Sequence, residues 1–441
     1  AAQVINAGLN VRTNFSLPEN FIYPLRHAIS EGKISMQTID SRVADVLRVK
    51  FMMGLFDNPY KGDTKKLEKV VHCKEHQNVS MRAALESIVL LKNENNILPL
   101  SKSIKKVAVI GPNAAEVDNL ICRYGPANAP IKTVYQGIKD YLPDSEVRYA
   151  KGADIIDEYF PESELYDVPL NKTEETMIDE AVALAKESDV AIMVLGGNEK
   201  TVREEYSRTN LDLCGRQEKL LQAVYATGKP VILVMIDGRA ATINWAERYI
   251  PGIVHAWFPG EFMGDAIAKV IFGDYNPGGK LAVTFPRSVG QIPFAFPFKP
   301  GSDSKGFVRV TGSLYPFGYG LSYTTFDYSA LKIENPVIGT QGSVKLSCRV
   351  KNTGKIAGDE VVQLYLHDEV SSVTTYVKVL RGFERIHLQP GEEKVVDFVL
   401  TPQDMGLWNK DNHFIVEPGT FAVMVGSSSQ DIRLQGKFEV K

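Results

Sequence analysis

A glycine-led loop brings several ionisable side chains together in a short stretch of the sequence. Residues 196–213 contain three glutamates and two arginines, namely Glu199, Glu204, Glu205, Arg203 and Arg208. A glutamic acid in such a loop could act as a general acid if partial burial raised its pKa, and an arginine could hold a substrate hydroxyl or orient a carboxylate. The alternative is a solvated loop with surface ion pairs, which the spacing alone favours.

The elements around this loop predict a mostly parallel sheet covered by helices on both faces. Short apolar runs end at turn residues, and helical patterns lie between them. The predicted strands are residues 107–110, 190–195, 231–236 and 253–258, and the predicted helices are residues 82–91, 174–186, 216–226 and 261–272. Ligands of such sheets bind outside the carboxyl ends of the strands. We therefore expect functional residues in the loops that open at Gly111, Gly196 and Gly260.

The end of the chain predicts an all-β domain. Residues 286–312 are rich in proline and phenylalanine and predict a connector. Beyond it, apolar and polar residues alternate, with turn residues between the runs, as in residues 344–350, 362–366, 396–400 and 421–425. This pattern indicates an immunoglobulin-like or fibronectin-type sandwich.

The first residues are interpreted as the end of an α/β domain whose beginning is missing. Residues 1–8 look like the last turn of a helix closed by Gly8, residues 9–13 predict a short strand, and residues 20–31 predict a helix. Ser35 stands at an N-cap position before a further helical pattern that Gly54 ends. A strand with two helices cannot bury its own faces, so we expect the chain to be a piece of a longer protein.

Composition removes several classes of function. Fifty basic and fifty-three acidic side chains give a net charge of -3, so a basic nucleic-acid-binding surface is not expected. No apolar run approaches the roughly 18 residues that a membrane span needs. The four cysteines lie singly along the chain, without a CxxC metal pattern, and we expect neither a metal nor a cofactor.

The glycine-led loop resembles a segment of glycoside hydrolase family 3, the β-glucosidase and β-xylosidase family, whose members show E-x-E-G-x-D-R-x-x-L-x-L-P-G-x-Q. The matching residues are Glu204, Arg208, Leu211, Leu213, Gly215 and Gln217. The sequence departs from the pattern at Val202, Glu205, Ser207 and Cys214, where the family usually has Glu, Gly, Asp and Pro. Further matches follow in order at residues 6–10, 86–93, 98–100, 109–114, 228–231, 257–261, 276–281 and 317–323.

The resemblance implies a fold of class α/β plus all-β. Residues 1–75 would be the tail of a (β/α)8 barrel with its linker, and residues 76–290 an α/β sandwich domain with a mostly parallel sheet. Residues 291–324 would be a connector, and residues 325–441 a fibronectin type III-like β-sandwich.

The resemblance also implies a retaining mechanism, which needs a nucleophilic carboxylate and a second carboxyl group that acts as acid and then as base, about 5–5.5 Å apart. It makes Glu204 the acid/base, and Glu205 and Glu199 are competing candidates. The alternative to a catalytic role for Glu204 is a salt bridge to Arg203 or Arg208. The family's nucleophile is an Asp in an S-D-W-like or S-D-Y-like motif, which this sequence does not contain. We therefore expect the chain to lack the nucleophile, most of the barrel and most of the sugar pocket.

Other residues are candidates for substrate contact. Tyr124 lies where relatives carry an aromatic wall for the leaving-group sugar, and Arg203 and Arg208 accompany Glu204. Asn10, which stands where the family usually has Asp, and Arg12 would border the pocket at the end of a barrel strand. His255 is interpreted as a satisfied core histidine, and Trp257 has the same explanation.

The resulting prediction is an exo-acting retaining β-glycosidase that releases terminal β-linked glucose or xylose from oligosaccharides or other glycosides, in the periplasm or outside the cell. Its expected partners are the glycoside substrate and the missing barrel segment, and a homodimer is one assembly that the resemblance allows. The alternatives are a non-catalytic sugar-binding or structural partner chain and an unrelated nucleotide-binding α/β protein. The Gly111 and Gly196 loops fit neither phosphate-binding glycine pattern, which weakens the last of these.

Overall fold

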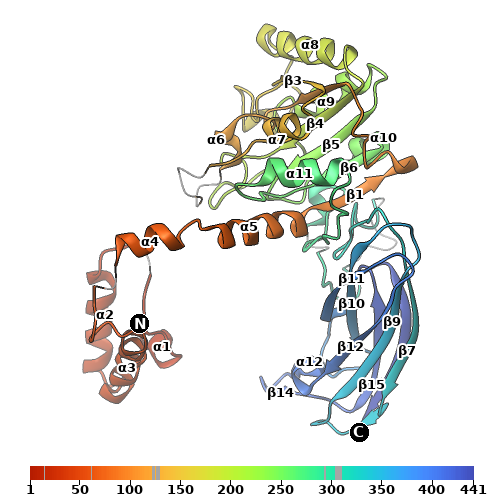
Figure 1. Ribbon diagram of the computed structural model, residues 1–441. Helices are drawn as coiled ribbons and strands as arrows, with labels where there is room; N and C mark the ends of the chain where they lie inside the picture. Colours follow the sequence, from red (N-terminus) through yellow and green to blue (C-terminus); the bar gives the residue numbers. More distant parts are fainter. Residues whose placement is uncertain (14, 61, 122–124, 126–129, 293–294, 303–309) are drawn as a thin grey trace. The chain divides into compact units, whose positions relative to one another are not determined.

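The computed structural model describes residues 1–441 except 14, 61, 122–124, 126–129, 293–294 and 303–309 (Figure 1). The chain forms two compact units, Ala1–His76 and Gln77–Lys441. None of the described helices is both long and apolar enough to cross a lipid bilayer.

The first unit is helical. Its helices are α1 (Ala2–Asn6), α2 (Glu19–Ser30), α3 (Met36–Met52) and α4 (Thr64–Val70), followed by α5 (Lys74–Ser87), which continues into the second unit. The predicted cap of α3 is confirmed, because the Ser35 hydroxyl accepts a hydrogen bond from the Thr38 amide at 3.0 Å. The predicted strand at residues 9–13 is wrong: these residues form no strand, since the described part of this unit contains no strand for them to pair with. The assignment of this unit to a barrel stays a prediction.

The second unit begins with a six-stranded sheet in the order β1-β6-β5-β4-β2-β3. The strands are β1 (Val89–Asn93), β2 (Lys106–Ile110), β3 (Glu146–Ala150), β4 (Val190–Gly196), β5 (Val231–Ile236) and β6 (Gly252–His255). All neighbours pair in parallel except β1, which pairs antiparallel with β6, so the mostly parallel sheet is confirmed. The predicted helix at residues 82–91 is wrong beyond Ser87, because Val89 to Leu91 are buried in the edge strand.

Helices cover both faces of this sheet, as the alternation of side chains along its strands requires. In β4, Ile192 and Val194 pack with α7 (Val134–Tyr141) and α11 (Met263–Ile271), whereas Met193 and Leu195 pack on the opposite face. That opposite face carries α8 (Lys172–Lys186), α9 (Gln217–Tyr225) and α10 (Asn244–Tyr249), which Figure 1 shows on the yellow and green part of the chain. The short helix α6 (Val117–Leu120) follows β2.

The predicted β-sandwich follows a connector that contains one 3-10 turn, η3 (Val289–Gln291), among its described residues. One sheet has the order β11-β10-β15-β16-β8, the other β12-β9-β7, and β13 pairs with β14 in a hairpin. The elements are β7 (Phe326–Glu334), β8 (Val337–Ile338), β9 (Val344–Asn352), β10 (Gly358–Asp368), β11 (Val379–Leu388), β12 (Glu393–Leu400), α12 (Pro402–Met405), β13 (Leu407–Trp408), β14 (Phe414–Ile415), β15 (Gly419–Gly426) and β16 (Ile432–Val440). The predicted alternation is confirmed, since the apolar side chains of β9 face a core shared with β10, β12 and β15.

Polar side chains join this sandwich to the α/β part of the same unit. The Arg385 guanidinium on β11 donates to Asp359 through Nε and Nη2, at 2.9 and 2.7 Å, and also to the Tyr275 hydroxyl at 3.0 Å. A second bridge pairs Lys280 with Glu360 at 3.4 Å, with side chains that are 10% and 3% exposed. The sandwich is therefore joined to the sheet domain by one buried ion pair, Lys280 with Glu360, and by the partly buried Arg385.

Candidate active site

The glycine-led loop leaves the sheet at its topological switch point. Chain order runs from β2 outward to β3 and then returns to β4 on the other side of β2. The longer helices that follow β2 and β4, α7 and α9, lie on opposite faces of the sheet. Ligands of parallel sheets bind outside the strand ends at such a switch point.

Two glycines allow the strands to approach each other closely at this point. Gly111 and Gly196 have φ angles of 132° and 144°. A Cβ atom on Gly111 would lie 2.1 Å from the Val194 oxygen, and one on Gly196 would lie 2.0 Å from the Ile236 oxygen. Neither position accepts a side chain, which explains the glycines at both strand ends.

Amide side chains connect the loop after β2 with the loop after β4. The buried Asn113 donates through Nδ2 to the Gly197 oxygen at 2.9 Å, and the Asn198 amide donates to Asn119 Oδ1 at 2.8 Å. The loop after β4 is thereby tied to the loop after β2.

The first half of the loop, residues 197–206, is held from β5. Arg239 follows this strand and donates to two main-chain oxygens of the loop, to Thr201 through Nε at 2.9 Å and to Tyr206 through Nη2 at 2.7 Å. Val202 packs between two glycines, because a Cβ on either Gly197 or Gly238 would lie 2.6 Å from a Val202 methyl group.

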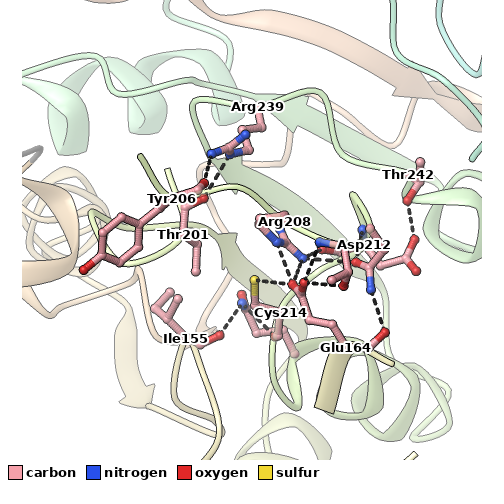
Figure 2. A network of polar contacts seen from close by, with 12 residues as sticks. Ile155, Glu164, Thr201, Tyr206, Arg208, Asp212, Cys214, Arg239 and Thr242 are labelled. Atoms are coloured by element: carbon pink, nitrogen blue, oxygen red, sulfur yellow. Dashed lines mark hydrogen bonds and ion pairs between the residues drawn. The ribbon is translucent and has the colours of Figure 1, made fainter. Parts of the chain in front are cut away.

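The second half of the loop is organised by one buried carboxylate, Glu164, which comes from the segment between β3 and α8 (Figure 2). Arg208 pairs with Glu164 at 2.5 Å, with both side chains at most 6% exposed, and Thr209 donates to Glu164 through its amide and its hydroxyl. Arg208 also donates to the Asp212 main-chain oxygen at 2.8 Å and to Asn210 Oδ1 at 3.1 Å. These contacts fix the backbone of residues 208–212.

Gln217, the first residue of α9, closes the loop. Its side chain is fully buried, accepts from the Gly196 amide at 2.8 Å and donates to the Gly196 oxygen at 2.9 Å. The same Nε2 also donates to the Cys214 oxygen at 3.1 Å. The glutamine amide thus completes the hydrogen bonds of the last residue of β4, where another strand would otherwise be needed.

The three candidate glutamates have different surroundings. Glu204 is exposed and lies between Thr201 and Tyr206, whose main-chain oxygens accept hydrogen bonds from Arg239. Glu205 is also exposed and has a φ angle of 71°. Glu199 lies 3.6 Å from the Arg203 guanidinium, which covers the Tyr206 ring at 3.8 Å. The loop can therefore present a carboxyl group to a ligand on an otherwise fixed backbone.

Comparison with known proteins decides the family. The family model "Glycosyl hydrolase family 3 C-terminal domain" matches residues 88–323, more than half of the chain, and "Fibronectin type III-like domain" matches residues 360–429. The chain belongs to glycosyl hydrolase family 3. The predicted family is confirmed, as are its C-terminal sheet domain and its fibronectin-like sandwich.

Individual members of family 3 match along nearly the whole chain. A β-xylosidase of Formosa agariphila is 40% identical over 439 residues, covering 97% of this chain and 58% of the relative. A periplasmic β-glucosidase of Salmonella typhimurium is 39% identical over 436 residues, covering 93% and 57%. The solved structure of a β-glucosidase from Listeria innocua in complex with glucose is similar with a TM-score of 0.84 and 29% identity, covering 100% and 59%. The chain thus spans less than two thirds of the length of each of these family 3 proteins.

The other predicted contact residues lie in different parts of the chain. Asn10 and Arg12 lie in the first unit, where Asn10 lies near the Asp45 carboxylate and Arg12 donates to Ser16 at 2.7 Å. Tyr124 lies outside the described residues. Arg203 and Arg208 belong to the loop, but their observed partners are the protein's own groups. The substrate contacts of all five residues stay predictions.

His255 is a core residue, as predicted, but the prediction that it is satisfied is wrong. Its ring is fully buried and lies edge-on to Trp257 and Phe285, at centroid distances of 4.2 and 5.3 Å. Neither ring nitrogen has a hydrogen-bond partner among the described residues. Burial lowers the pKa of His255 to about 3, so the ring is neutral. Trp257 takes part in the same aromatic cluster.

Three residues that organise the loop were missed from the sequence. Glu164 and Arg239 lie far from the loop along the chain, so no local pattern connects them with it. The third, Asp237, directly follows β5; it is 4% exposed beside the loop, and burial raises its pKa to about 6. A buried acidic residue directly after an apolar strand was the available signal.

Proposed function

We propose that this chain supplies the acid/base half of an exo-acting retaining β-glycosidase that releases terminal β-linked glucose or xylose. The observation that carries the proposal is Glu204, an exposed carboxyl group on a rigidly held loop at the switch point of a family 3 C-terminal domain. One relative is named a β-xylosidase and another a periplasmic β-glucosidase, which supports both the substrate class and a periplasmic or secreted location.

In the proposed reaction, a carboxylate from the part of such proteins that this chain does not cover attacks the anomeric carbon of the glycoside. Glu204 gives its proton to the leaving oxygen as the glycosidic bond breaks, and a glycosyl ester forms on the nucleophile. Glu204, now a carboxylate, then takes a proton from water as the water oxygen attacks the same carbon. The ester bond breaks, the nucleophile is regenerated, and the sugar leaves with its configuration retained.

The test compares Glu204→Ala with Glu205→Ala and Glu199→Ala in the complete gene product. The substrates are a phenyl β-glycoside, whose leaving group needs a proton, and a dinitrophenyl β-glycoside, whose leaving group does not. We expect Glu204→Ala to lose about 10²–10⁴-fold in rate on the phenyl substrate, the usual contribution of a general acid, and far less on the dinitrophenyl substrate. Azide should restore turnover on the activated substrate and yield a β-glycosyl azide, because azide attacks without needing a base.

The neighbouring variants serve as matched controls. If Glu205→Ala or Glu199→Ala shows the leaving-group dependence and Glu204→Ala does not, the role moves to that residue. If the complete protein hydrolyses no β-glycoside, the proposal is wrong, and binding of glucose, xylose or their oligomers would then favour the non-catalytic sugar-binding alternative.

A further inference from the structure

Arg239 hydrogen-bonds the main chain on both sides of the proposed acid/base, Glu204. The Thr201 and Tyr206 oxygens that accept from Arg239 lie three residues before and two residues after Glu204. Because Nε and Nη2 belong to one planar guanidinium, the two bonds fix the distance and the angle between these carbonyl groups. The segment that carries Glu204 is closed at its base by a single side chain.

Arg239 is itself held in place by the end of β5. Its amide donates to Asp237 Oδ1 at 3.0 Å, and Asp237 is almost fully buried. Asp237 also lies directly beneath the start of the loop, since a Cβ on Gly197 would be 3.1 Å from Asp237 Oδ1 and 2.8 Å from Thr201 Oγ1. Strand β5 therefore provides a rigid base for the guanidinium.

Apolar packing holds the same segment against the same base. Val202 fills the space between Gly197, which follows β4, and Gly238, which lies between Asp237 and Arg239. Phe258 closes this space, because a Cβ on Gly238 would lie 3.3 Å from its ring. Residues 201, 202 and 206 are thus held by these contacts, whereas Glu204 is exposed.

We infer that Arg239 is a positioning residue for the acid/base, one that holds the backbone on both sides of Glu204 so that its carboxyl group meets the leaving oxygen. The inference rests on the proposed function. Arg239 need not touch the substrate. A displacement of a catalytic group by about 1 Å costs about 10²-fold in rate, so loss of both hydrogen bonds should affect the proton-transfer step specifically.

The test uses Arg239→Ala and Arg239→Lys in the complete protein, with Arg248→Ala as the matched control. Arg248 is an exposed arginine on α10 whose guanidinium lies over Tyr249, away from these hydrogen bonds. On the phenyl β-glycoside we expect Arg239→Ala to lose about 10²-fold, and on the dinitrophenyl β-glycoside less than about tenfold. Arg239→Lys should remain impaired on the phenyl substrate, because a single ammonium group cannot reproduce the two hydrogen bonds of the planar guanidinium. Arg248→Ala should match the parent.

Two further measurements separate positioning from general damage. Free guanidinium ion should restore part of the phenyl-glycoside activity of Arg239→Ala, and hydrogen exchange should speed up in residues 199–206 while the strands of the sheet stay protected. Equal losses on both substrates, or unchanged exchange in residues 199–206, would overturn the inference.

These outcomes also separate this inference from the proposed function. If Glu204→Ala shows leaving-group dependence and Arg239→Ala does not, only the role of Arg239 is wrong. If Glu204→Ala shows none, the acid/base assignment is wrong as well.

Discussion

The buried pair of Glu164 and Arg208 offers the sharpest test of how the loop is held. Replacing Glu164 by glutamine keeps the shape of the side chain but removes its charge, so the Arg208 guanidinium is left buried without a counter-charge. Both side chains are at most 6% exposed, and the carboxylate also accepts two hydrogen bonds from Thr209. Breaking a buried ion pair from one side costs about 3–5 kcal/mol.

The magnitude can be measured in two ways. Urea unfolding of Glu164→Gln should show this loss in the free energy of unfolding. Hydrogen exchange of residues 208–213 should accelerate by about 10²- to 10⁴-fold, since each 1.4 kcal/mol is a factor of ten. Replacing Arg208 by methionine in the same chain removes the uncompensated charge, so the double variant should cost much less than the sum of the two single variants.

A surface pair in the same segment gives the control. Asp167 pairs with Lys219 at 2.6 Å, but the two side chains are 80% and 40% exposed. Asp167→Asn should leave both the unfolding curve and the exchange unchanged, because water screens such a pair. A loss below about 1 kcal/mol for Glu164→Gln, or additive costs in the double variant, would refute the claim that this pair fixes the loop.

Three further predictions concern the end of the sheet. Gln217→Leu leaves the amide and the oxygen of Gly196 buried and unpaired, which costs about 1–3 kcal/mol for each group. Urea unfolding should show the sum of the two costs as a loss in the free energy of unfolding. A near-neutral result would contradict the role of Gln217 in completing the hydrogen bonds of Gly196. Burial raises the pKa of Asp237 to about 6, above the usual 3.9 of an unfolded aspartate, so the native state binds the proton more tightly and loses stability as the pH rises from about 4 to 6. The free energy of unfolding of Asp237→Asn should therefore rise by about 2–3 kcal/mol relative to that of the parent between these two pH values. If the free energies of unfolding of the two proteins, measured in urea, change with pH in parallel, the prediction is wrong. Burial raises the pKa of Cys214 to about 12, so a thiol reagent at neutral pH should label Cys214 only in urea, whereas fast labelling of the native protein would show that the loop opens.

The sequence predicted the sheet well because buried parallel strands leave an unbroken apolar signature, as in residues 190–195. It failed at β1, because Val89 to Leu91 extend a helical pattern and only their pairing with β6 makes them a strand. The location of the loop was likewise predictable from the strand that it follows. Its supports were not, since Glu164 lies 44 residues before Arg208 in a segment without periodicity. Contacts that depend on tertiary folding leave no local pattern for sequence reasoning to detect.

The junction of Arg385 with Asp359 and Tyr275 makes the fibronectin-like sandwich an unsuitable part to remove or exchange. A shortened protein that ends before the sandwich would lose both Arg385 and Glu360, and would leave Lys280 without its carboxylate at a newly exposed surface. An engineer who wished to graft this sandwich onto another family 3 sheet domain would have to carry the Tyr275 and Lys280 contacts with it. In evolution, the same contacts favour inheritance of the two domains as one piece.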